Sequence, residues 1–96
     1  MSTDAGAVED LERIRAEVER VDRELIRLIG ERVRLAREVG AAKRRAGVPT
    51  LDPAREAAVI RRAGSLAREA GLAEDDVRDI FWHVIGLSRR AQLEEP

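Results

Sequence analysis

The sequence lacks cysteine altogether and has only two aromatic residues, Phe81 and Trp82, among its 96 residues. Without cysteine the chain has no disulfides and no thiolate metal ligands, and this composition is compatible with a reducing compartment. We therefore expect a cytoplasmic protein. With so few aromatic side chains any core must be aliphatic, and a chain of this length is enough for one domain.

Long hydrophobic runs and an excess of either charge are also missing. The longest apolar stretches are a few residues, too short for a membrane span or for the apolar part of a signal peptide, so we expect no membrane association. Charged residues make up 39% of the chain, yet the formal net charge is only −1. A general nucleic-acid-binding protein would carry a basic excess, so no nucleic-acid partner is expected.

The longest predicted element is a helix over about residues 8–46, in which apolar residues recur every three or four positions. It follows a tail, residues 1–8, that we expect to be flexible, and residues 9–96 form the one predicted domain. Gly47 ends the helix, because glycine readily adopts the left-handed conformation found at helix ends. No stretch of the chain alternates with the period of two that is typical of strands.

Two shorter helices are predicted after it. Asp52 is a good N-cap and Pro53 suits a first turn, so the second helix begins there and ends before Gly71. Its apolar stripe is predicted to run through Val59, Ala63, Leu66 and Ala70. The third helix opens at the acidic residues 74–76, which complement the helix dipole, although Ala73 offers no capping side chain. The predicted fold is all-α, with three helices per chain.

The length of the first helix predicts a partner. About 39 helical residues span roughly 58 Å, whereas a compact monomer of this size has a radius of gyration of about 12 Å. Gly30 and Gly40 each cost this helix about 1 kcal/mol relative to alanine, which indicates that another backbone approaches closely there. We expect an intertwined helical homodimer. The alternative is a break at one of the two glycines, which would fold the helix back into a monomeric bundle.

Ionisable residues interrupt the apolar stripe of the first helix. Steps of three and four residues place four of them on or beside the core-facing seam: Arg15, Asp22, Arg32 and Lys43. Taken singly, an arginine of this set could lie along the seam with its charged end in water, and Asp22 could pair with an arginine. Lys43 is the single lysine among 18 basic residues. Either a compact ammonium is required at that position, or a surface lysine has been kept by chance.

Polar residues also follow the apolar stripes of the shorter helices. Glu56 lies one step before the stripe of the second helix, and Ser88 and Gln92 extend that of the third. Singly, these are ordinary polar residues at helix ends; together with the cations they would line a wet pocket for a small dianion that carries a hydroxyl. Arg15 lies roughly 25 Å along the helix from Arg32, so it reaches the same ligand only from an antiparallel partner.

These residues resemble the motifs of the AroQ-type chorismate mutases. The resemblance covers most of the chain, from about Leu11 to Gln92, and is carried by Ile14-Arg15 through Val21-Asp22, Glu31-Arg32, Lys43, Asp52-x-x-Arg55-Glu56 and Ser88-x-x-x-Gln92. It implies an intertwined homodimer with two shared active sites. It also implies the Claisen rearrangement of chorismate to prephenate, on the route to phenylalanine and tyrosine. This reaction is unimolecular, so catalysis consists of holding the folded substrate and stabilising the charge that develops.

The resemblance also implies a role for each site residue. Arg32 and the partner's Arg15 would bind the two substrate carboxylates. Lys43 and Gln92 would donate hydrogen bonds to the ether oxygen as its bond breaks. A carboxamide donates at any pH, whereas a glutamate in its place would first have to be protonated. We therefore expect activity that does not require acidic conditions.

The ring end of the substrate involves the remaining residues. By the same resemblance, Glu56 and the backbone near Asp52 would hold the ring hydroxyl. Arg55 and Ser88 would complete the carboxylate contacts. Neither a cofactor nor a metal ion is expected to take part.

Three alternative functions stay open at this point. An isochorismate-pyruvate lyase could share the scaffold, although those relatives look poorer in the Asp-x-x-Arg-Glu and Ser-x-x-x-Gln elements. A mutase for 4-amino-4-deoxychorismate is a closer alternative, because Glu56 could also accept a ring ammonium. A helical dimerisation or binding module would need no catalysis, but it would leave cations near a core without a ligand to satisfy them.

Overall fold

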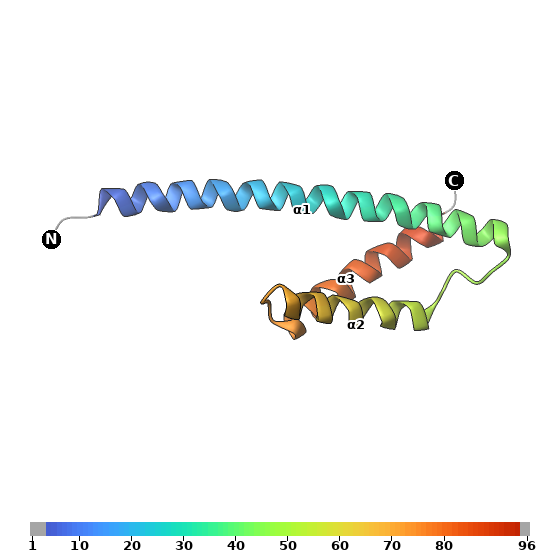
Figure 1. Cartoon of the computed structure of the whole chain (residues 1–96). Coiled ribbons are helices and arrows are strands. Elements are labelled where there is room, and N and C mark those ends of the chain that lie inside the picture. Colours follow the sequence, from blue (N-terminus) through green and yellow to red (C-terminus); the bar gives the residue numbers. More distant parts are fainter. Residues whose placement is uncertain (1–3, 95–96) are drawn as a thin grey trace. The chain divides into compact units, whose positions relative to one another are not determined.

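The computed structural model describes residues 4–94, which form three helices and no strand. In chain order these are α1 (Ala5–Ala46), α2 (Pro53–Glu69) and α3 (Glu74–Leu93). The all-α prediction with three helices is thereby confirmed. The chain divides into two compact units, residues 1–31 and 32–96. The first unit contains most of α1, and the second contains its last turns together with α2 and α3 (Figure 1).

α1 begins earlier than its apolar periodicity predicted. The Asp4 side chain accepts a hydrogen bond from the backbone N–H of Ala7 at 3.0 Å, and its carbonyl accepts one from Val8 at 3.1 Å. Asp4 therefore caps the helix, because an N-cap carboxylate satisfies a backbone donor that has no partner within the helix. Residues 1–3 of the predicted flexible tail lie outside the described residues. The helix continues without a break through both Gly30 and Gly40.

Two glycines end the first two helices in the same way. Gly47 and Gly71 have positive φ angles of 68° and 73°. After α1, the N–H of Val48 donates to the carbonyl of Lys43 at 3.1 Å, and after α2 the N–H of Leu72 donates to that of Ala67 at 2.8 Å. These are Schellman motifs, in which glycine takes the left-handed position at little cost. The stops that the sequence predicted at both glycines are confirmed.

The predicted starts of α2 and α3 are also found. The side chain of Asp52 accepts a hydrogen bond from the backbone N–H of Arg55 at 3.0 Å, and Pro53 occupies the first turn of α2. α3 starts after Ala73 without a side-chain cap, and three acidic residues lie in its first turn. Figure 1 shows α3 folding back from the end of α2 toward the last turns of α1. This return brings the end of α3 close to the pocket described below.

The core of the second unit is built from small side chains. Its buried apolar residues are Ala36, Val59, Ala63, Ala67, Ile85 and Ala91. The predicted stripe of α2 is wrong in its second half, because Leu66 is 53% exposed and Ala67 is buried in its place. The buried face advances by steps of four, and its alanines allow α2 and α3 to pack closely.

Gly40 lies where α3 approaches the last turns of α1. A Cβ built on Gly40 would overlap with the carbonyl oxygen of Gln92 and would lie 2.8 Å from its Cα. The close backbone approach predicted at Gly40 is therefore found, and it comes from the chain's own α3. At Gly30 no described atom lies within 4 Å of such a Cβ, so that glycine has no comparable contact within the described chain.

The first unit is a single helical stretch whose described residues, 4–31, are all exposed. They include the large apolar side chains of Val8, Leu11, Ile14, Val18, Val21, Leu25, Ile26, Leu28 and Ile29. A stripe of this size has no cover within its own unit. Among the described residues no helix is long and apolar enough to cross a bilayer.

Candidate active site

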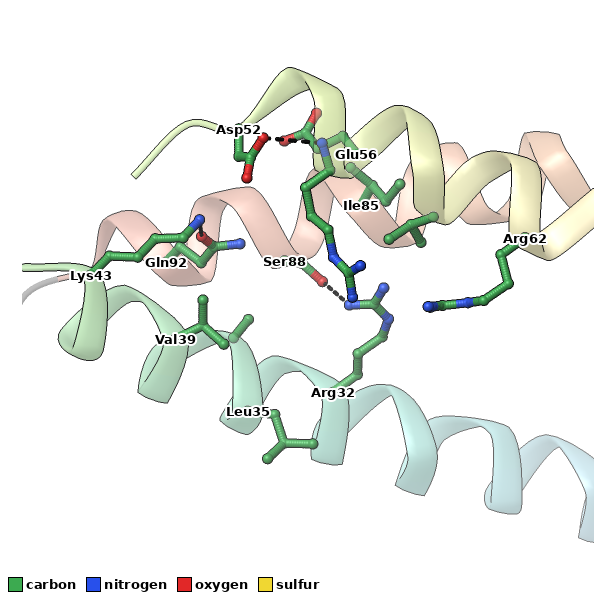
Figure 2. Close-up of a pocket in the computed structure, with 13 residues that line it drawn as sticks. Arg32, Leu35, Val39, Lys43, Asp52, Glu56, Arg62, Ile85, Ser88 and Gln92 are labelled. Atoms are coloured by element: carbon green, nitrogen blue, oxygen red, sulfur yellow. Dashed lines mark hydrogen bonds between the residues drawn. The ribbon is translucent and has the colours of Figure 1, made fainter. Parts of the chain in front are cut away.

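The second unit contains a pocket of about 560 Å³ between the last turns of α1, the start of α2 and the second half of α3. Its lining residues are Arg32, Leu35, Ala36, Val39, Lys43, Asp52, Arg55, Glu56, Val59, Arg62, Ile85, Ser88 and Gln92. Figure 2 shows charged side chains from α1 and α2 entering it from opposite sides. The volume suits a small molecule, and the lining combines an apolar wall with a few polar groups, which is typical of ligand sites.

Arg32 forms one end of the polar lining. Its Nη1 donates a hydrogen bond to the hydroxyl oxygen of Ser88 at 2.8 Å (Figure 2). Burial lowers the pKa of the Arg32 guanidinium, and the positive charges of Arg62 and Arg55 lower it further. Arginine stays charged despite such shifts. Arg32 therefore stays positively charged close to two other arginines, and a bound anion would reduce the repulsion among these three charges.

Lys43 and Gln92 meet at the other end of the pocket. The Lys43 ammonium donates to the side-chain oxygen of Gln92 at 2.8 Å and to the carbonyl oxygen of Thr50 at 2.8 Å. Because its oxygen is engaged, the Gln92 carboxamide turns its NH₂ group away from Lys43 (Figure 2). An ammonium has three donors, and the described residues accept from two of them. Both side chains therefore keep a hydrogen-bond donor for a ligand.

The two acidic residues of the lining are held by local contacts. Asp52 caps α2 through the backbone N–H of Arg55. Glu56 accepts two hydrogen bonds from Arg89 of α3, at 3.0 Å and 2.6 Å. The hydrogen bond from Arg89 lowers the pKa of Glu56 most, and the charge of Lys43 lowers it further, against the opposing effects of burial and of Asp52. Glu56 is therefore ionised at neutral pH.

The balance of charge in the lining is positive. Four cationic side chains, Arg32, Lys43, Arg55 and Arg62, face only two carboxylates. Clefts lined by one sign of charge attract ligands of the opposite sign, and the apolar wall strengthens this attraction by excluding water. An excess of two positive charges fits a ligand that carries two negative ones. Among the described residues, no group of three or more His, Cys, Asp or Glu side chains is placed to hold a metal ion.

The structure brings most of the predicted site residues together. Seven of the eight line this one pocket: Arg32, Lys43, Asp52, Arg55, Glu56, Ser88 and Gln92. The eighth, Arg15, lies in the first unit, on an exposed turn of α1. Its contribution from a partner chain stays a prediction, as do the individual roles of all eight residues.

Comparison with known proteins identifies the family of this chain. The family model described as chorismate mutase type II matches residues 14–93. This chain belongs to the chorismate mutase type II family. The resemblance stated from its motifs is thereby confirmed.

Two relatives and one solved structure are similar to this chain over different shares of their own length. The chorismate mutase of Methanocaldococcus jannaschii is 32% identical over 87 residues, which cover 91% of this chain and 88% of that protein. The T-protein of Haemophilus influenzae is 36% identical over 74 residues, or 77% of this chain, but the match spans only 20% of the T-protein. A solved structure of a conserved hypothetical protein from Pyrococcus furiosus superposes with a TM-score of 0.71 at 29% identity, over 86% of this chain and 95% of that one.

Two arginines of the site were not predicted. Arg62 lines the pocket seven residues after Arg55, so it shares a face of α2 with it. That spacing was a usable signal. Arg89 pairs with Glu56, but the sequence offered nothing to distinguish it from its neighbour Arg90, because which of two adjacent arginines faces α2 depends on how the helices pack.

Proposed function

We propose that this member of the chorismate mutase type II family converts chorismate to prephenate by a Claisen rearrangement, on the route to phenylalanine and tyrosine. The observation that carries the proposal is the uncompensated positive charge of the pocket. Four cations line it, and of its two carboxylates Glu56 is already paired with Arg89. A substrate with two carboxylates supplies the missing negative charge, and no acid, base or nucleophile is needed for a unimolecular rearrangement.

The two ends of the pocket would contact different parts of the substrate. Arg32, held by Ser88, would bind one substrate carboxylate through its planar fork of donors. Lys43 and Gln92 would donate to the ether oxygen, where negative charge grows as the bond breaks. Because both donors are positioned before the substrate arrives, little reorganisation is needed at the moment of reaction. The apolar wall of Val39, Val59 and Ile85 would hold the substrate in its compact reactive shape.

The proposed enzyme is a homodimer with two shared sites. The apolar side chains of the first unit are exposed, and a second copy of the same stripe would bury them. Arg15 lies on that unit and would enter the partner's pocket as a further carboxylate ligand. A cytoplasmic location is part of the proposal, because a chain without cysteine is compatible with a reducing compartment.

The test is turnover of three related substrates by the purified protein. Loss of chorismate absorbance is measured beside isochorismate and 4-amino-4-deoxychorismate. Chorismate is expected to react with product prephenate, and Arg32→Met is expected to abolish most of this activity. Arg34→Met is the matched control, because Arg34 lies on the same helix, is exposed and pairs with Glu38 outside the pocket. No turnover of any of the three would favour a binding module, and release of pyruvate from isochorismate would favour the lyase.

A further inference from the structure

Glu56 and Arg89 form a two-pronged ion pair between α2 and α3. The Nε of Arg89 donates to one carboxylate oxygen at 3.0 Å, and its Nη2 donates to the other at 2.6 Å. Both side chains are partly shielded, with 24% of Glu56 and 38% of Arg89 exposed. A guanidinium fork on a carboxylate fixes the orientation of both groups. The position of Glu56 is therefore set by Arg89.

Arg89 acts from outside the pocket. Glu56 is one of the lining residues and Arg89 is not. A bound ligand would touch Glu56 without touching Arg89. Any effect of Arg89 on a ligand must therefore pass through Glu56.

This arrangement changes what Glu56 can accept. Each carboxylate oxygen has two lone pairs, and the fork of Arg89 uses one on each oxygen. The remaining lone pairs can still accept a hydrogen bond from a neutral hydroxyl. A ligand ammonium would find a carboxylate whose charge is already offset by Arg89, and the nearby Lys43 ammonium and Asp52 carboxylate act on it in opposite directions. Repulsion between like charges disfavours that ligand.

We propose that Arg89 is a positioning residue that sets the ring-substituent specificity of the pocket, favouring a substrate with a neutral ring hydroxyl over one with a ring ammonium. The inference rests on the proposed mutase function and deepens it. Without Arg89, Glu56 would be a free carboxylate beside the ring, and an ammonium would be the better partner for it. The sequence alone does not distinguish chorismate from 4-amino-4-deoxychorismate as the substrate, whereas the Glu56–Arg89 pair favours chorismate.

The direction of the Glu56 pKa agrees with this assignment. The Arg89 hydrogen bonds are the largest cause of the lowered pKa of Glu56. Removing them would raise that pKa, because burial and Asp52 both act in the upward direction and only the charge of Lys43 would oppose them. The acid limb of the activity profile would then move to higher pH, which a purely structural loss of stability would not produce.

The test compares kcat/KM for chorismate and for 4-amino-4-deoxychorismate in four proteins: wild type, Arg89→Met, Arg89→Lys and Arg90→Met. The wild type is expected to prefer chorismate, and Arg89→Met to lower that preference by about tenfold. Arg89→Lys keeps the charge and is expected to retain most of the preference. Arg90→Met is the matched control, since Arg90 is the exposed neighbour of Arg89 and does not line the pocket. Both substrates are assayed on one preparation, so the folded fraction cancels from the ratio.

Each outcome of this test bears on one claim. An unchanged ratio in Arg89→Met, or a wild type that prefers the amino substrate, would overturn the role of Arg89 while leaving the mutase function standing. If Arg89→Met does not fold, the ratio is measured in Arg89→Gln, which removes the charge and keeps a polar side chain: a lowered preference supports the role of Arg89 and an unchanged one overturns it. Turnover of neither substrate by the wild type would instead overturn the proposed function, and the inference with it.

Discussion

The ammonium of Lys43 donates a hydrogen bond to the side-chain oxygen of Gln92 at 2.8 Å, so a residue near the end of α1 fixes the orientation of a residue near the end of α3. The contact leaves the Gln92 NH₂ group as a donor to the cavity. It also joins the two groups proposed to stabilise the breaking ether bond into one unit. Gly40 makes this contact available, because it lets the backbone of Gln92 approach α1.

Gln92→Glu is expected to make the activity depend on acid. An ionised glutamate would pair with Lys43 and offer no donor, so kcat/KM at neutral pH is expected to fall by about a hundredfold, the usual scale for losing such a donor. Protonation below about pH 5 should restore part of the activity. The measurement is the pH profile of kcat/KM for wild type, Gln92→Glu and Gln92→Leu. Parallel profiles for all three would argue against a donor role for Gln92.

Arg62→Gln is expected to weaken substrate binding more than catalysis. Arg62 lines the pocket and adds to the positive potential that lowers the pKa of Arg32. Its loss should raise KM by about threefold to tenfold, with little change in kcat and a weaker dependence on salt. Arg61→Gln is the control, because Arg61 is exposed and does not line the pocket. Equal effects of the two substitutions would show that only the net charge of the protein matters.

Gly40→Ala is expected to destabilise the fold. Its Cβ would overlap with the backbone of Gln92, which cannot move as a side-chain end can. Overpacking of this kind costs about 1–3 kcal/mol, which lowers the Tm of a domain of this size by at least about 4 °C. Gly86→Ala on α3 is the control, since its nearest neighbour is the flexible end of Arg90 at 3.5 Å. A Tm that rises in Gly40→Ala would contradict the close contact.

The Glu56–Arg89 pair predicts a pH-dependent contribution to stability. The folded pKa of Glu56 is lowered, chiefly by Arg89, so the pair stabilises the fold fully above the ordinary glutamate value of about 4.3. This stabilisation is lost as the pH falls through the lower folded pKa. The Tm difference between wild type and Glu56→Gln should therefore be constant from pH 7 to 5 and shrink below about pH 4. Asp79→Asn, which removes an exposed carboxylate with no ion pair among the described residues, should show no such trend.

Much of the fold could be predicted from local sequence signals. Asp52 and Gly47 act through their own backbone conformations, so the start of α2 and the end of α1 were found from the sequence. Leu66 and Arg89 could not be placed in this way, because which side of a helix is covered depends on its packing against another helix. The predicted role of Arg15 depends neither on local backbone signals nor on packing within the chain, since it requires a second chain.

Most residues that line the pocket could be predicted from the sequence. Lys43 stood out as the single lysine, and Glu56 stood out as a carboxylate on an apolar stripe. Both residues line the cavity. Arg62 was missed although its spacing from Arg55 was a usable signal, because arginines on exposed helix faces are common.

Subunit mixing tests the central claim, that two chains share each active site, most directly. Arg15→Ala and Lys43→Ala chains, each inactive alone, are dissociated, mixed in equal amounts and reassociated, with formation of mixed dimers followed by a tag on one chain. In each mixed dimer one pocket keeps its own Lys43 and receives an intact Arg15 from its neighbour. Since half of the dimers are mixed and each has one intact pocket, activity is predicted to recover to about a quarter of the wild-type value. Mixed dimers that form but stay inactive, or a wild type that is fully active as a monomer, would contradict the shared site.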